Sequence, residues 1–471
     1  MHQSMTRKGF IGAAFAAGTM SAATGVAAAG KSLPPKSGKR WYRGMLHMHT
    51  LWSDGRALPE QCAAAYKDAG YDFISFTDHN RLGVDPARYI AVGNGTEKGW
   101  PPICVHPDCF KHYMERFGKT ASVRKGGEGG LTLVRLKTFA EVQAMFEEKE
   151  KFLMIPGVEL TTDVKVNGVT YAMHMNVVGI DDVIERAKRA KLIEFLPGRT
   201  VATAIRESRE LSEALAKQRG NPPFFCMVNH PNWLYYDVFA QDLIDNPEIR
   251  FFEVCNNGSE WPVPDELDGE WYHDNLWDAV LAYRLTHGQQ ILYGIATDDT
   301  HFYPGTGLEY SAFGDGFIMV RANELSQKAL FDAIQRGDFY AGSQQDLEDV
   351  SFDRKTGKLT VSVPATPGVA FKIRFITTKK GAPLDPVRYV DIPPTAEHMN
   401  RARKVPIYDG RIGATVKLVE GGKGERLEAS YSLAADDLYV RARVESDAPT
   451  KFKRARCLHP AHHTAWTQPY V

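Results

Sequence analysis

The placement of histidines and carboxylates constrains this chain more than any other feature of its sequence. Before about residue 345, nearly every short apolar run ends in, or carries, one of these side chains. The runs span residues 44–50, 73–79, 152–160, 172–180, 224–230, 251–256, 291–298 and 317–320. Each run has the length of a single strand. A fold that gathers the strand ends at one edge therefore brings these side chains together.

Helical patterns lie between several of the apolar runs, at residues 58–69, 139–151, 201–218, 276–287 and 325–336. Near-continuous apolar strands that alternate with helices are typical of a parallel sheet covered on both faces, or of a barrel. The sequence therefore predicts an α/β domain over residues 41–345.

Beyond residue 345 the pattern changes to alternating strand-like segments, with few helical patterns among them. Examples are residues 359–363, 371–376 and 438–442. We expect a smaller C-terminal β-rich domain over residues 346–471, built as a sandwich or as a sheet that packs on the main domain.

Composition excludes several classes of protein. The 471 residues are 43% hydrophobic, which argues against disorder over most of the chain. Basic and acidic side chains balance at 57 each, so no basic surface for nucleic acid is evident. The mature chain has no internal run of about 20 apolar residues, so the sequence predicts no membrane span there. Oligomeric state has no signal in the sequence.

The N-terminus has the pattern of an export signal. Arg7 and Lys8 precede an apolar stretch that is rich in Ala and Gly, and small residues at 27–29 form a cleavage pattern. The order of residues 6–11 is similar to a twin-arginine signal, with Lys8 at the second arginine. We therefore predict a signal over residues 1–29, a linker over residues 30–40, and a periplasmic or extracellular mature protein.

Cysteines are too few for a disulfide scaffold. The chain has 6, and the sequence does not determine their connectivity. Cys104 and Cys109 are close enough in sequence to pair in an oxidising compartment. Cys226 and Cys255 lie in apolar runs, which favours buried, inert thiols.

Imidazole and carboxylate together are the ligand set of divalent metals such as Zn, Mn or Fe. His47 and His49 are two residues apart, so a strand would point both toward one cation. Asp54 also fits a simple turn, whereas Asp78 and Asp298 are expected to support the site or cap helices. The side chains predicted to bind metal are His47, His49, Asp54, His79, Glu159, His174, His230, Asp299 and His301.

This order of motifs resembles the polymerase-and-histidinol-phosphatase (PHP) family of metallohydrolases over residues 41–345. The resemblance implies a distorted (β/α)7 barrel, two or three divalent metal ions, and the nine ligands named above. Most characterised members of that family hydrolyse phosphate esters. Residues 174–179, 337–341 and 465–469 resemble the exported branch that is related to carbaryl hydrolases. An insertion at about residues 81–150 departs from compact members of the family.

Three functions are compatible with this pattern. Three divalent cations, three carboxylates and one bridging hydroxide leave an excess of about +2, which favours an anionic small-molecule substrate. We therefore expect a hydroxide bridged by metal ions to attack a phosphate mono- or diester. The alternatives are carbamate or ester hydrolysis by the same hydroxide, and a silent metal-containing binding module. Arg56, Arg81 and Lys111 are candidates for contacting phosphate oxygens, although each also fits a solvated surface charge.

Overall fold

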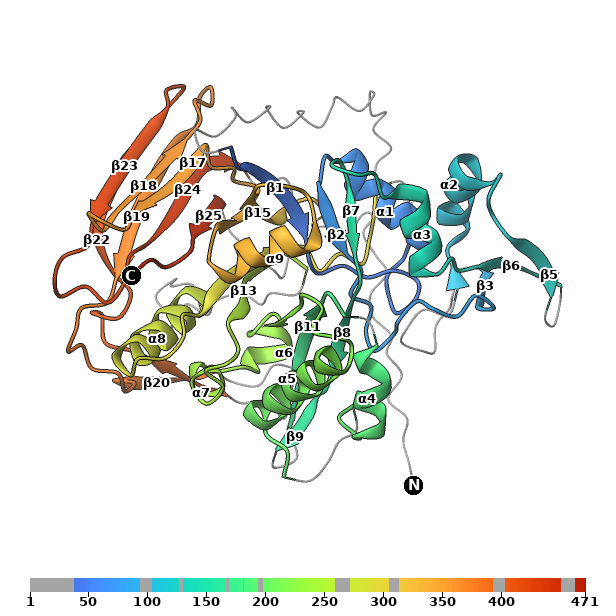
Figure 1. Cartoon of the computed structure of the whole chain (residues 1–471), viewed down its shortest axis with the longest axis horizontal. Helices are drawn as coiled ribbons and strands as arrows, with labels where there is room; N and C mark the ends of the chain where they lie inside the picture. Colours follow the sequence, from blue (N-terminus) through green and yellow to red (C-terminus); the bar gives the residue numbers. More distant parts are fainter. Residues whose placement is uncertain are drawn as a thin grey trace, which may run out of the picture. The chain divides into compact units, whose positions relative to one another are not determined.

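The computed structural model describes residues 38–93, 104–126, 130–166, 169–180, 182–193, 198–258, 272–304, 313–392, 403–449 and 462–471 (Figure 1). The predicted export signal and most of the predicted linker lie outside the described residues. The helices are α1 (Pro59–Asp68), α2 (Pro107–Phe117), α3 (Phe139–Phe146), α4 (Val183–Arg189), α5 (Val201–Gln218), α6 (Trp233–Tyr236), α7 (Ala240–Ile244), α8 (Tyr272–Thr286) and α9 (Gln327–Gln335). No helix in these ranges is long and apolar enough to cross a membrane.

Two larger sheets contain the strands that carry the predicted ligands. In the described ranges the first sheet has nine strands, in the order β22 (Ala414–Gly422), β19 (Ala370–Thr377), β24 (Arg441–Pro449), β25 (His462–Thr467), β16 (Phe339–Ser343), β15 (Gly316–Ala322), β1 (Arg40–Met45), β2 (Phe73–Ser75) and β7 (Leu153–Ile155). The second has five, in the order β14 (Tyr293–Thr297), β13 (Phe251–Asn256), β12 (Phe225–Val228), β11 (His174–Val178) and β8 (Gly157–Thr161).

Smaller sheets hold the remaining described strands. They are β3 (Tyr89–Val92), β4 (Cys104–Val105), β5 (Val123–Gly126), β6 (Leu131–Arg135), β9 (Val164–Val166), β10 (Val169–Tyr171), β17 (Asp349–Asp353), β18 (Lys358–Val363), β20 (Arg388–Ile392), β21 (Arg403–Ile407) and β23 (Leu427–Ser432). The structure is therefore mixed α/β, as the sequence predicts.

The sheets are mixed rather than parallel throughout. The pairs β1–β2, β2–β7, β12–β13 and β13–β14 are parallel, whereas β1–β15, β8–β11 and β11–β12 are antiparallel. Pro156 separates β7 from β8, and the chain passes from the first sheet to the second at this residue. Isolated parallel bridges join His79 to Glu159 and Met48 to Thr300. Strand pairing in the described residues does not close into a continuous barrel, so the (β/α)7 barrel stays a prediction.

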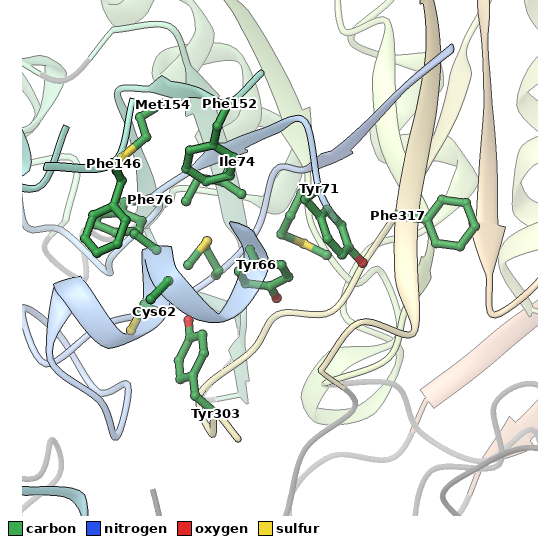
Figure 2. Packing of buried hydrophobic residues seen from close by; sticks show 14 of the residues in the cluster. Cys62, Tyr66, Tyr71, Ile74, Phe76, Phe146, Phe152, Met154, Tyr303 and Phe317 are labelled. Carbon is green, nitrogen blue, oxygen red and sulfur yellow. The ribbon is translucent and has the colours of Figure 1, made fainter. Parts of the chain in front are cut away.

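Helix α1 packs on β2 and β7 of the nine-stranded sheet through a core that contains several aromatic side chains (Figure 2). Cys62 and Tyr66 on α1 are buried together with Ile74 of β2, Met154 of β7, and Phe152 directly before β7. The helix begins at Pro59, whose fixed φ suits the first helical turn. This packing anchors the loop between β1 and α1, which carries three of the predicted ligands, His47, His49 and Asp54.

The predicted insertion forms a separate small sheet, β4-β3-β6-β5, together with α2. Glu60 on α1 accepts hydrogen bonds of 2.7 Å from both Tyr113 and Lys137 of the insertion. All three side chains are buried, which holds the insertion on α1. Cys104 and Cys109 are both free thiols in the structure, so the disulfide that the sequence left open is not formed.

Every described element after β16 is a strand, and a separate C-terminal domain over residues 346–471 stays a prediction. Four of these strands, β22, β19, β24 and β25, do not form a sheet of their own, because β25 pairs with β16 and they extend the sheet that contains β1. Near the C-terminus, the Gln468 amide exchanges two hydrogen bonds, 2.8 and 3.0 Å long, with the backbone of Gly294 in β14. The C-terminal strands therefore support strands that carry predicted ligands.

Candidate metal centre

Eight of the nine predicted ligands lie on strands or shortly after strand ends, and the ninth lies in a loop. His47 and His49 follow β1, His79 follows β2, and His230 follows β12. Glu159 and His174 lie on the neighbouring strands β8 and β11, while Asp299 and His301 follow β14. Asp54 lies in the loop between β1 and α1. The sheets therefore bring together side chains that are up to about 250 positions apart in sequence.

All nine side chains belong to four overlapping groups in which the possible ligand atoms lie within 4.8 Å of one another. The groups are His49, Asp54, His79 and His301; His47, His230 and Asp299; His47, His49 and Glu159; and His79, Glu159 and His174. Because the groups share members, they form one continuous cluster. We call these nine side chains the metal centre.

Glu159 lies at the middle of the metal centre. Its Oε2 is 2.8 Å from Nδ1 of His79 and 3.3 Å from Nε2 of His49. Its Oε1 is 3.2 Å from Nδ1 of His174 and 3.4 Å from Nε2 of His230. Oε1 is also 3.3 Å from Nε2 of His47, so the two oxygens reach five imidazoles, which is the arrangement of a ligand shared between neighbouring cations.

Asp54 occupies one side of the metal centre. Its Oδ2 is 3.1 Å from Nε2 of His301 and 3.7 Å from Nε2 of His79. The His49 ring stacks on both of these rings, with centroids 4.2 Å from His301 and 4.4 Å from His79. The turn interpretation of Asp54 is therefore incomplete, because its carboxylate points at three imidazoles.

Access from solvent is confined to the same side. The side chains of His79 and His301 are 24% and 21% exposed, whereas the other seven members are buried. Arg56 lies on the loop that carries Asp54, is half-buried, and packs 5.8 Å from the centre of the Phe302 ring. Arg81 and Lys111 are exposed, in agreement with solvated surface charges.

Charges within the metal centre are strongly coupled. Burial and the neighbouring His301 and His79 rings lower the pKa of His49 to about 4, so its imidazole is neutral near pH 7. Burial opposes a rise in the pKa of His174, but Glu159 and Asp163 still raise it to about 10. Burial also disfavours ionised Asp54, yet His301 holds the pKa of that carboxyl well below its usual range. Imidazoles and carboxylates here stabilise one another in the absence of a cation.

Two residues at strand ends adopt positive φ angles that are unusual for non-glycine residues. His230 has a φ of 22° and Asp299 has a φ of 49°. Such conformations cost of order 1–3 kcal/mol and persist where surrounding contacts enforce them, often at functional sites. Both residues belong to the metal centre, which indicates that these backbone conformations direct the two side chains into it.

Asp78 and Asp298 lie outside the four groups and support nearby loops. Asp78 accepts hydrogen bonds from Thr50 and Ser53, which shape the loop before Asp54. Asp298 accepts 2.6 and 2.5 Å hydrogen bonds from the backbones of Gly314 and Gly316. Burial raises the pKa of Asp78 to about 6 and that of Asp298 to about 7, against the effect of these hydrogen bonds.

Several polar residues that contact the metal centre were not predicted from the sequence. Glu253 lies 2.7 Å from Nδ1 of His47, Asp163 lies 3.1 Å from Nε2 of His174, and Asn229 donates a 2.7 Å hydrogen bond to Glu159. Thr161 lies 2.6 Å from Nδ1 of His79. Glu253 had a signal in the sequence, because a charged residue inside an otherwise apolar strand needs a buried partner.

The donor set fits divalent metal ions. Six imidazoles and three carboxylates match the preference of Zn, Mn and Fe for nitrogen and oxygen ligands. Within the described residues, the buried atoms Glu159 Oε2 and His174 Nδ1 have no hydrogen-bond partner, although both face other members of the metal centre. Buried polar atoms without a hydrogen bond are rare in native proteins, and a bound cation would satisfy both.

No protein-family model matches the chain, and no curated protein matches it. A two-domain protein from Bacteroides vulgatus ATCC 8482, containing a predicted PHP-like metal-dependent phosphoesterase, is a similar solved structure. It is 16% identical with a TM-score of 0.36, over 94% of this chain and 100% of that one. A proposed metal-dependent phosphoesterase from Bifidobacterium adolescentis ATCC 15703 is 12% identical, with a TM-score of 0.24 over 59% and 93% of the two chains.

An amidohydrolase from Chromobacterium violaceum, with bound sulfate and no metal, is 13% identical, with a TM-score of 0.26 over 57% of this chain and 90% of that one. All three TM-scores are below 0.5. The functional conclusion below rests on the geometry of the metal centre.

Proposed function

We propose that this chain is a metal-dependent hydrolase of the PHP superfamily, acting on phosphate mono- or diesters. One observation carries the proposal: the convergence of nine His, Asp and Glu side chains in four overlapping groups. Burying ionisable groups costs free energy unless they are paired or bind a cation. A buried cluster of this size therefore costs free energy of folding, and a purely structural role does not explain that cost.

In this proposal the metal centre holds two or three divalent cations, with Zn, Mn and Fe as the candidates. Bound cations would activate a water molecule as the nucleophile and stabilise negative charge that develops on the substrate. The seven buried members hold the cations away from bulk water. His79 and His301 border the exposed side, so the substrate approaches past these two rings.

Phosphate is favoured when three divalent cations are bound, because their positive charge then exceeds the negative charge of their ligands. The buried Glu253 lowers the excess deduced from the ligands alone, from about +2 to about +1. A net positive site still attracts a phosphate dianion. Arg56 adds a cation on the loop of Asp54, at the side where the metal centre meets solvent. The substrate panel below compares the rates of phosphate and carbonyl substrates directly.

The decisive experiment combines elemental analysis with a substrate panel. We expect purified protein to contain at least two equivalents of Zn, Mn or Fe, and to hydrolyse aryl phosphates. Chelation should abolish turnover, and added Mn²⁺ or Zn²⁺ should restore it. A His49→Ala variant should lose at least 100-fold in kcat/KM. Turnover that is indifferent to chelation would contradict the proposal.

The same panel separates the alternatives. Faster turnover of aryl carbamates than of aryl phosphates would assign carbonyl hydrolysis to this centre, as in carbaryl hydrolases. Bound metal without turnover of any phosphate, carbamate or ester would assign a binding module.

Export to the periplasm or the exterior is also part of the proposal. It rests on the pattern of residues 1–29. Intact-mass measurement of the protein from the periplasmic fraction should show a chain that begins near residue 30. Full-length protein that is confined to the cytoplasm would contradict export.

A further inference from the structure

Glu253 on β13 is a fully buried carboxylate that belongs to none of the four ligand groups. Its two oxygens accept four hydrogen bonds. Oε1 lies 2.7 Å from Nδ1 of His47 and accepts a 2.6 Å hydrogen bond from Thr297. Oε2 accepts hydrogen bonds of 2.7 Å from the backbone of His230 and 2.8 Å from the amide of Asn256. Its hydrogen-bonding capacity is fully used within the protein.

The contact with Oε1 determines which nitrogen of His47 is available to a cation. An ionised carboxylate only accepts hydrogen bonds, so the proton of the imidazole must reside on Nδ1. Nε2 then carries the lone pair, and it lies 3.3 Å from both His49 Nε2 and Asp299 Oδ1. Glu253 thus directs the metal-binding nitrogen of His47 into the metal centre.

The contacts with Oε2 act on two further members. The hydrogen bond from the His230 backbone holds this residue in its unusual conformation with a φ of 22°. Asn256, which donates to Glu253, also lies 3.3 Å from Oδ2 of Asp299. Directly or through Asn256, one carboxylate therefore contacts all three members of the group formed by His47, His230 and Asp299.

We propose that Glu253 is the positioning residue for one particular divalent cation, the one held by His47, His230 and Asp299. The inference rests on the metal centre of the proposed function and deepens it. No hydrogen bond in the described residues joins Glu253 to Asp54, His79 or His301, so the cation position formed by these residues with His49 does not depend on Glu253. Because His47 also belongs to the group with His49 and Glu159, the effect of Glu253 is expected to be largest for the cation held by His47, His230 and Asp299 and smallest at the position formed by Asp54, His79 and His301.

A Glu253→Gln variant tests this inference, because an amide group cannot accept the hydrogen bonds that now reach both oxygens. Glu60→Gln is the matched control. Glu60 is equally buried and accepts hydrogen bonds from Tyr113 and Lys137, but it contacts no member of the metal centre. The measurement is calorimetric titration of the chelated, full-length chain with Zn²⁺, followed by elemental analysis after dialysis.

We expect Glu253→Gln to bind one Zn²⁺ at least 10-fold more weakly than the unmodified chain, while the remaining ions are affected less. Glu60→Gln should lose stability and keep the Zn²⁺ stoichiometry and affinities. Thr297→Val removes a single hydrogen bond from Oε1 and serves if Glu253→Gln does not fold. It should weaken the same ion by a few fold.

The outcomes are distinguishable from failure of the proposed function. If the unmodified chain binds no Zn²⁺, the metal centre itself is refuted. If the unmodified chain binds Zn²⁺ and both Glu253→Gln and Thr297→Val bind it identically, the positioning role of Glu253 is overturned and the metal centre stands. An equal weakening of every ion would also overturn the assignment to one cation.

Discussion

At the scale of single residues, several members of the metal centre are oriented by polar neighbours outside it. Asn229 donates to Glu159, Thr161 contacts His79, and Asp163 contacts His174. These contacts leave one nitrogen of each ring facing the cluster. Partners of this kind commonly change metal affinity by 10–100-fold when they are removed.

Asp163 gives a direct test of this view. Its carboxylate lies 3.1 Å from Nε2 of His174, and its side chain is partly exposed. We expect Asp163→Ala to weaken the binding of one Zn²⁺ by about 10-fold, with little loss of thermal stability. Titration of the chelated protein with Zn²⁺ measures this. Asp182→Ala removes an exposed carboxylate that pairs with Arg219 and should leave binding unchanged. Identical affinities in the two variants would contradict a role for Asp163.

Asp242 on α7 predicts a pH dependence of stability away from the metal centre. Burial raises its pKa to about 6, although the backbone of Phe239 donates to it a hydrogen bond of 2.9 Å. The folded state therefore binds more protons than the unfolded state between about pH 4 and pH 6. Stability from this group is present below the unfolded pKa and is lost as pH rises through the folded pKa.

Asp242→Asn should consequently raise the free energy of unfolding by about 1 kcal/mol at pH 7.5 and have no effect near pH 4. Urea unfolding at both pH values measures the difference. Asp332→Asn, at an exposed carboxylate of α9 that is not among the groups shifting the pKa of Asp242, is the control and should change little at either pH. A gain for Asp242→Asn that is equal at both pH values would exclude titration as its cause.

At the scale of elements, close backbone approach fixes the segments that carry the metal centre. Gly258 follows β13 and lies against the turn after β14. A Cβ atom at this position would lie 2.5 Å from the carbonyl oxygen of Asp298 and 2.6 Å from that of Asp299. Only glycine therefore allows the two strand ends to meet, and Asp299 depends on that contact for its position.

Gly258→Ala should displace the turn that carries Asp299 without unfolding the chain. We expect a loss of at least 10-fold in Zn²⁺ affinity for one ion and a comparable loss of phosphatase activity. Gly410→Ala provides the control, because a Cβ there meets no atom within 4 Å. Elemental analysis after dialysis at limiting Zn²⁺ distinguishes the two, and full metal content in Gly258→Ala would refute the prediction.

At the scale of the whole molecule, buried charge ties the C-terminal strands to the rest of the described structure. Arg441 on β24 is fully buried and forms ion pairs with Asp274 and Asp278 of α8, at 2.7 and 2.5 Å. Trp466 on β25 lies 3.2 Å from Asp274. Because β25 also pairs with β16, we expect the described strands on both sides of residue 345 to unfold together.

Arg441→Met should destabilise the protein by about 3–5 kcal/mol, because it leaves the buried Asp278 without its cation and Asp274 with Arg443 alone. Arg426→Met, which breaks surface pairs with Glu348 and Glu428, should cost less than about 1 kcal/mol. Denaturant unfolding followed by circular dichroism measures both. A separate early transition that is sensitive to Arg441→Met and leaves the metal centre intact would show instead that residues 346–471 form an independent domain.

Much of the fold was predictable because apolar periodicity is a local property. The sequence placed a helix over residues 201–218, and α5 has these bounds. The pattern over 438–442 was less accurate, because β24 begins only at Arg441. The side chain of Arg441 itself shows why: a buried guanidinium interrupts the apolar pattern, and its carboxylate partners lie on a distant helix.

The sequence alone determined which side chains gather, because an imidazole or carboxylate at a strand end is visible in the order of residues. All nine predicted ligands accordingly lie in one cluster. Only the tertiary structure decided which of them face one another, and which further residues hold them. Glu253, Asn229 and Asp163 come from separate strands or loops, and hydrogen bonds at 2.7–3.1 Å depend on how those strands are arranged in space. Distance along the chain carries no information about such contacts.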